Sequence, residues 1–344
     1  MNRLFLGVFV VVGACGDDGG SATDAASAPD SALADGALAA DAAGPDANVT
    51  MPMKLSETGL YADIATDVIA SDVRFYQPEY VLWSDGATKR RWVYLPPGSQ
   101  IDTLDMDYWT LPVGTKLWKE FTRDGVRVET RLLQKNGPND WFMMPYQWND
   151  EQTEAVAVAD GVHDASGTPH DIPNTSDCNT CHGKIGDVAL GFSAIQLSHN
   201  LSGLTLSDLR ANGELTDNPP GGGYSVPGNA DVEPALGYLH ANCGGCHHAR
   251  SPLMTVVPLQ LRVSTAASNP SQTSAYLTAV CVAPTLNVGG ATSLIEGGDA
   301  STSAVHLRMS LRTPQQMPPL GTEDVDTAGL AMVDKWINSL PACP

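Results

Sequence analysis

Residues 178–182 read CNTCH and residues 243–247 read CGGCH, so one C-x-x-C-H pattern occurs twice in this chain. The chain has only seven cysteines in 344 residues. In each copy two thiols stand three positions apart, and a histidine follows the second thiol directly. The first motif consists of Cys178, Cys181 and His182, and the second motif consists of Cys243, Cys246 and His247. Such a repeat predicts a shared chemical role for these six side chains.

The spacing is the attachment pattern of c-type haem. Each of the two thiols can bond to one vinyl group on the edge of a haem, and the adjacent histidine then lies under the ring and binds the iron. We therefore predict two covalently bound haem c groups, one on each motif, with the motif histidine as the iron ligand. The alternatives are one zinc ion held by four thiolates, or disulfides. Neither alternative gives a reason for a histidine directly after both cysteine pairs.

The start of the chain has the layout of a bacterial export signal. Residues 1–14 carry one basic side chain before an apolar run and end in Gly13 and Ala14, directly before Cys15. This arrangement resembles a lipobox, so we predict a lipoprotein signal peptide over residues 1–14 and a lipid on Cys15. An ordinary signal peptide that contains a cysteine is the alternative. The expected location is the periplasmic side of a bacterial membrane or the outer membrane, with the protein held there by its lipid.

Residues 15–50 are predicted to be a disordered tether. They are nearly all Ala, Asp, Gly, Ser and Pro, without Lys, Arg, Glu or an aromatic residue. Such a segment cannot bury enough apolar surface to offset the entropy cost of ordering. The whole chain has a formal net charge of −20. A chain this acidic repels nucleic acid, so we expect no nucleic acid partner, and any electrostatically attracted redox partner should be basic.

Two cysteines, Cys281 and Cys343, remain after Cys15 and the two motifs are assigned. Thiols outside the cytoplasm become oxidised unless they are otherwise occupied. We therefore expect a disulfide between Cys281 and Cys343, with two buried thiols as the alternative.

The segment before the first motif has the two-residue alternation of β-strands. Six of the seven tryptophans lie between Trp83 and Trp148, and Asp124–Gly125 is a hairpin turn signal between two alternating runs. We expect a β-sandwich-like domain over residues 51–168. A first haem-binding segment over 169–228 and a cytochrome c-like domain over 229–344 follow it. The predicted fold class is α+β multidomain, with the β-sandwich-like domain followed by a mainly α-helical c-type cytochrome region that carries two haems.

The second motif lies between two predicted helices. Apolar residues recur at helical spacing in DVEPALGYLHANC, directly before it, and in EDVDTAGLAMVDKWINSLP, near the end of the chain. The pair resembles the first and last helices of a cytochrome c domain, in which Gly237 would allow an aromatic ring such as that of Trp336 to approach. Between them Met317 precedes two prolines. This resembles the segment that carries the sulfur ligand in c-type cytochromes, and Met309 is the rival ligand.

The second iron ligand at the first motif stays open in the sequence, because no methionine occurs between Cys181 and Met254. The candidates are His170, just before the motif, and His199, after it. An upstream methionine, or no ligand at all, are the other possibilities. An iron without a second ligand would be open and reactive.

The order of LWSDGATKRRWVYLPPGS, PVGTKLWKEF, VETRLL, DCNTCHG, LGFSAIQLSH, ALGYLHANCGGCH and MPPLGTE resembles a family of exported di-haem c-type cytochromes with an N-terminal β-domain. The resemblance covers about residues 55–344. It implies haem attachment at both motifs and an iron ligand role for Met317. The expected function is single-electron transfer in the bacterial periplasm or cell envelope. A peroxidase-like enzyme with one open iron and a haem-containing ligand-binding or sensory module are the alternatives.

Overall fold

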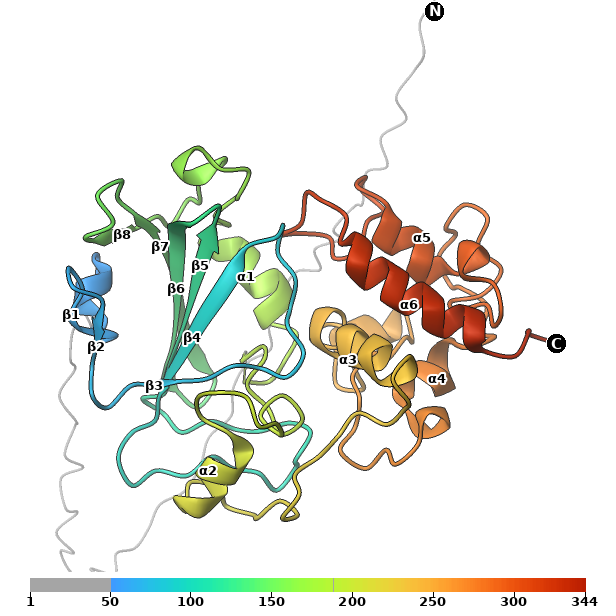
Figure 1. The fold of residues 1–344 in the computed structure, drawn as a ribbon, viewed down its shortest axis with the longest axis horizontal. Coiled ribbons are helices and arrows are strands. Elements are labelled where there is room, and N and C mark those ends of the chain that lie inside the picture. The colour runs from blue at the N-terminus through green and yellow to red at the C-terminus, as the bar shows by residue number, and fades with distance from the viewer. Residues whose placement is uncertain (1–50, 188) are drawn as a thin grey trace, which may run out of the picture. The chain divides into compact units, whose positions relative to one another are not determined.

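A six-stranded antiparallel sheet forms the first part of the structure, in which the strands follow each other in chain order (Figure 1). A computed structural model describes residues 51–187 and 189–344. The strands are β3 (Arg74–Phe75), β4 (Thr88–Tyr94), β5 (Lys116–Arg123), β6 (Val126–Gly137), β7 (Asp140–Trp148) and β8 (Ala155–Ala157). A separate pair consists of β1 (Tyr61–Asp63) and β2 (Val68–Ile69). The expected signal peptide, the lipid on Cys15 and the tether lie outside the described residues.

The predicted hairpin turn at Asp124–Gly125 is confirmed. It joins β5 to β6, and both residues have positive φ angles, 50° and 83°. Two-residue turns of this conformation match the natural twist of the paired strands, and Asp followed by Gly adopts it at low cost. From this turn the register runs along both strands, with one irregularity between Phe121 and Thr122.

The expectation of a β-sandwich is wrong, because the other sheet in the described part of the chain is only the short pair β1–β2, which adds Tyr61 to the core on one face. One face of the sheet carries the core around Trp92, Trp118 and Leu132. On the other face Val93, Leu117 and Leu133 pack in a second core. The rest of that core includes Phe192, Leu197, Leu206, Leu209 and Leu215. The second apolar face of the strands is therefore covered by chain that follows the first motif.

The expectation of a mainly α-helical cytochrome region is also wrong. Helices make up 23% and strands 19% of the structure. The α-helices are α1 (Thr175–His182), α2 (Leu206–Ala211), α3 (Val232–Asn242), α4 (Ser274–Ala279), α5 (Ala304–Ser310) and α6 (Thr327–Ser339). The 3₁₀ turns are η1 (Leu55–Glu57), η2 (Ala165–Gly167), η3 (Pro252–Thr255), η4 (Pro270–Gln272) and η5 (Ala300–Thr302). Prolines and glycines, 24 and 33 in the chain, interrupt helices and leave long irregular connections.

Helix α6 packs against α3 and against α5, around a core that includes Leu236, Leu239 and Trp336 (Figure 1). Asp326 caps the start of helix α6, because its side chain accepts a hydrogen bond from the backbone of Gly329. The helix ends before Pro341. The expected partner of Gly237 is corrected. A Cβ atom there would lie 2.0 Å from the ring of Tyr80, so the close aromatic neighbour is Tyr80 rather than Trp336.

Met51–Pro344 is one unit of the chain. The expected division of this unit after residues 168 and 228 stays a prediction. Within the described part of the chain, no helix combines the length and the apolar character that crossing a membrane requires.

Candidate cofactor cavity

The first motif occupies most of α1. The helix begins after Asn174, whose side chain accepts a hydrogen bond of 3.0 Å from the backbone of Asp177. Cys178 and Cys181 are three positions apart on this helix, which puts both thiols on one face. His182 is the last residue of the helix and is buried. The cap therefore fixes the first helical turn, and the helix periodicity presents the two thiols together.

The second motif forms a tight turn directly after α3. The backbone N–H groups of Cys246 and His247 donate to the carbonyl of Cys243, at 3.0 and 2.9 Å. The two residues between the cysteines are glycines for a steric reason. A Cβ atom on Gly244 would lie 2.5 Å from the carbonyl oxygen of His240, and one on Gly245 would lie 2.6 Å from the side chain of Leu190. Gly244 therefore has no room for a Cβ atom, because backbone fills that space, whereas a Cβ atom on Gly245 would have to displace the end of the Leu190 side chain.

Both motifs line a single cavity of about 620 Å³ with mostly apolar walls. All six motif side chains belong to its lining. The volume lies within the range of roughly 300–1,000 Å³ that is typical of small-molecule and cofactor sites. Two segments that are far apart in the sequence therefore share one cavity.

Two further contacts hold the motifs together. The neighbouring thiol of Cys246 lowers the pKa of Cys181 to about 7, and the pKa of Cys246 is raised in turn. His248 donates from Nε2 to the carbonyl of Lys184 at 2.9 Å, so the residue after the second motif is tied to the residues after the first. Its Nδ1 atom lies 3.3 Å from the hydroxyl of Tyr108. The two attachment segments are thus adjacent in space.

Met317, the predicted sulfur ligand of the second site, lines the same cavity as the second motif. Its backbone N–H donates to the carbonyl of Arg308 at 2.9 Å, which ties the Met317 loop to α5. The rival, Met309, is buried and also lines the cavity. The loop after Met317 is tied to the sheet part of the chain as well, because Asp85 accepts from the backbones of Glu323 and Asp324 at 2.8 and 2.9 Å.

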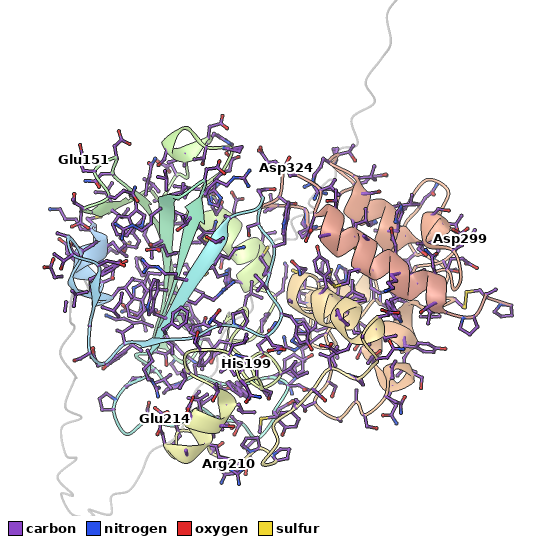
Figure 2. All side chains as sticks on the ribbon, viewed as in Figure 1. Glu151, His199, Arg210, Glu214, Asp299 and Asp324 are labelled. Atoms are coloured by element: carbon purple, nitrogen blue, oxygen red, sulfur yellow. A yellow bond between two sulfur atoms is a disulfide. The ribbon has the colours of Figure 1, made fainter. Side chains whose placement is uncertain are left out.

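The two histidine candidates for the first site lie in different places. His170 is buried and lines the cavity, with Nε2 at 2.7 Å from the carboxylate of Glu129. His199, which Figure 2 labels, is not among the residues that line the cavity. Its Nε2 donates to the carbonyl of Gln77 at 2.6 Å, and its Nδ1 accepts from the backbone of Leu201 at 3.0 Å. Both ring nitrogens of His199 are therefore already hydrogen-bonded.

The upstream methionines lie outside the cavity lining. Met144 is buried in the core on one face of the sheet, and Met143 packs against the core on the other face.

Sequence reasoning missed the cationic side chains on the cavity wall. Lys119 on β5 and Arg131 on β6 line the cavity beside the first motif. Phe121, which also lines the cavity, lies under both cations, with its ring centroid 5.8 Å from the Lys119 ammonium and 4.4 Å from the Arg131 guanidinium. The signal in the sequence was Lys119, a charged residue at an inward position between Leu117 and Phe121.

The donor set of the cavity fits haem c. Each motif offers two thiols and an imidazole, and the cavity adds the thioether of Met317. The Nδ1 atom of His247 is buried without a hydrogen-bond partner among the described residues, and burial lowers the pKa of this ring, which favours the neutral form that binds metals. In the described part of the chain no group of three or more His, Cys, Asp or Glu side chains is arranged to hold a bare metal ion, as a zinc site would require.

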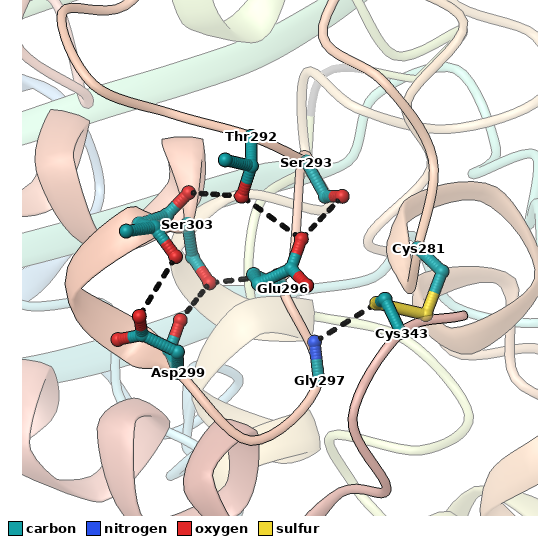
Figure 3. The surroundings of a disulfide bond; sticks show 9 residues. Cys281, Thr292, Ser293, Glu296, Gly297, Asp299, Ser303 and Cys343 are labelled. Carbon is teal, nitrogen blue, oxygen red and sulfur yellow. Dashed lines mark hydrogen bonds between the residues drawn. A yellow bond between two sulfur atoms is a disulfide. The ribbon is translucent and has the colours of Figure 1, made fainter.

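The structure joins Cys281 and Cys343 in a disulfide (Figure 3). The sulfur of Cys343 also lies 3.2 Å from the backbone nitrogen of Gly297, which donates to it. The bond links the C-terminal residues after α6 to the connection that follows α4. This pair is separate from the cavity, and it leaves the four motif cysteines as free thiols.

In this fold both C-x-x-C-H motifs face one mostly apolar cavity. No protein-family model, curated protein or solved structure matches this chain.

Proposed function

We propose that this protein is a di-haem c-type cytochrome that transfers single electrons in the bacterial cell envelope, and that it belongs to the family of exported di-haem cytochromes that its sequence resembles. One observation carries the proposal. Both C-x-x-C-H motifs line one mostly apolar cavity, and the candidate ligand Met317 lines it with them. A structural pair of cysteines has no need of such a cavity, whereas a covalently bound ring does.

The side chains of the cavity have distinct roles in this proposal. The four motif thiols bond to the two haems, and His182 and His247 bind the irons. Each bound haem supplies an iron that accepts and releases one electron. The sulfur of Met317 favours the ferrous state at the second site, because a thioether is a soft ligand. The apolar walls exclude water and so help to set both reduction potentials.

The adjacency of the motifs supports passage of an electron from one site to the other. Both motifs line one cavity, and His248 after the second motif hydrogen-bonds to the carbonyl of Lys184 after the first, so the two motifs are neighbours. A protein that only stored a ligand would gain nothing from this arrangement.

Mass spectrometry of the denatured, exported protein tests the proposal. Two haem masses should remain on each chain, and the reduced protein should show the narrow visible bands of haem c. The double variant Cys178→Ala/Cys181→Ala should retain one haem. The matched control, Asn179→Ala/Thr180→Ala, changes two exposed residues between the same cysteines and should retain both haems. A chain without covalent haem would refute the proposal.

A di-haem oxidoreductase with one open iron is the second candidate. The observation that favours it is the state of the two histidines near the first site. Both ring nitrogens of His199 are hydrogen-bonded away from the cavity, and His170 is held by Glu129. Carbon monoxide separates the two candidates, because it binds an open iron. Binding at one haem of the unaltered protein, together with rapid consumption of peroxide, would favour the enzyme.

We also propose that a lipid on Cys15 anchors the protein to a bacterial membrane and that its redox partners are basic. The lipobox-like start and the net charge of −20 support these two points. In the native host, Cys15→Ala should move the protein from the membrane fraction to the soluble fraction, and electron transfer to a basic cytochrome should slow as salt is added.

A further inference from the structure

Three cationic side chains lie in a row across one face of the sheet. The strand register pairs Arg91 of β4 with Lys119 of β5, and Lys119 with Arg131 of β6. Directly paired residues project to the same face of a sheet, and like charges at paired positions destabilise it. Three positive charges in register are therefore unfavourable unless something compensates them.

Arg91 is buried, Lys119 and Arg131 are half-buried, and among the described residues only Arg131 has an anionic partner. The side chain of Arg91 has no hydrogen bond or ion pair among the described residues, although the residue is only 4% exposed. The ammonium of Lys119 likewise has no hydrogen bond or ion pair within residues 51–187 and 189–344. The acid nearest to the row on the same face is Glu129, which is shared between Arg131 and His170.

A fourth basic side chain, that of Lys89, lies on the same face of the sheet. Lys89 lies one pair further along the face, opposite Phe121, and its ammonium donates to the carbonyls of Leu82 and Ala87 at 2.8 and 3.2 Å. Burial, together with the charges of Arg91 and Arg131, lowers the pKa of Lys119 well below its usual value. A bound anion would reverse this effect, because it would favour the charged ammonium.

The row borders the cavity at Lys119 and Arg131, beside the first motif. Phe121 lies under both cations and limits where an anion can approach them. A guanidinium and an ammonium that face one space, with an apolar ring below, suit a carboxylate, which accepts hydrogen bonds from both.

We propose that Lys119 and Arg131, supported by Arg91, form an anion site that binds carboxylate groups in the cavity. Two sources can supply this chemistry. One is the pair of propionates of a haem on the first motif, and this source rests on the proposed function. The other is a small soluble carboxylate that enters the cavity, and this source does not depend on haem.

Calorimetric titration of the purified full-length protein tests the soluble source, with succinate as the probe and neutral succinamide as the matched control ligand. A soluble-anion site predicts that succinate binds, that succinamide does not, and that Lys119→Met weakens succinate binding at least tenfold. Lys119→Arg, which keeps the charge, should retain binding. The control Lys335→Met removes an exposed lysine on α6 and should leave binding unchanged.

Resonance Raman spectroscopy of the same variants tests the propionate source. If propionates fill the site, succinate should not bind, and Lys119→Met and Arg131→Gln should shift the propionate vibrations of one haem while Lys335→Met shifts neither. The proposal is overturned if succinate does not bind and no propionate vibration moves in folded variants. Mass spectrometry keeps the two proposals apart. A chain without covalent haem refutes the cytochrome, while the succinate titration still decides the anion site.

Discussion

Removal of the disulfide between Cys281 and Cys343 should destabilise the protein strongly. The two residues are separated by 62 positions in the chain, so the bond closes a long loop. The loss of loop entropy in the unfolded chain for that separation corresponds to about 4 kcal/mol at 25 °C. The double variant Cys281→Ala/Cys343→Ala should therefore lower the free energy of unfolding by about that amount. The lost contact between the Cys343 sulfur and the backbone of Gly297 adds only a small further term.

Guanidinium unfolding followed by circular dichroism measures the effect. The neighbouring substitution Val282→Ala keeps the disulfide and should change the free energy of unfolding by less than about 0.5 kcal/mol. A thiol reductant should lower the free energy of unfolding of the unaltered protein to that of the double variant. It cleaves the disulfide and leaves thioether bonds to haem intact, so the disulfide is the only bond that changes. A loss below about 1 kcal/mol, or no effect of reductant, would show that the loop-closure reasoning fails here.

The remaining predictions concern the cavity. Met317→His should lower the reduction potential of one haem and abolish the weak far-red band of ferric sulfur ligation, as measured by spectroelectrochemistry; unchanged potentials would contradict a sulfur ligand at this position. His170→Ala should open the first iron to carbon monoxide, whereas His199→Ala should not, because His199 lies outside the cavity lining; equal binding by both variants would refute this assignment. Gly244→Ala should hinder closure of the second motif, and mass spectrometry should then show chains with one haem; full retention of two haems would contradict the steric argument.

The motifs were readable from the sequence because their chemistry depends on local spacing. Two thiols three positions apart and a following histidine lie together whether the chain forms a helix, as at the first motif, or a turn, as at the second. The Asp124–Gly125 turn was predictable for the same reason, since a positive φ angle is a property of the residues themselves. The site residues of the motifs and Met317 were thus available without a structure.

The fold class was not predictable, because it depends on which segments cover which face. The alternation in β4–β7 correctly indicated strands but did not indicate what covers their faces, and a second sheet is a common cover for the second face. Here residues around Phe192 and Leu206 cover it instead. The choice between His170 and His199 also depended on contacts that are distant in the chain. The ring of His170 contacts Glu129, and the ring of His199 bonds to the carbonyl of Gln77.

By itself, the sequence determined the local features on which the proposal rests: two C-x-x-C-H motifs, a methionine before two prolines, two leftover cysteines and an acidic chain with a lipobox-like start. Each is a local property of residue type and spacing. Only the tertiary structure decided that both motifs face one cavity, that His199 lies outside its lining, and that Arg91, Lys119 and Arg131 stand in one row. The physical reason is that strand register and long-range packing, which no short stretch encodes, bring these side chains together.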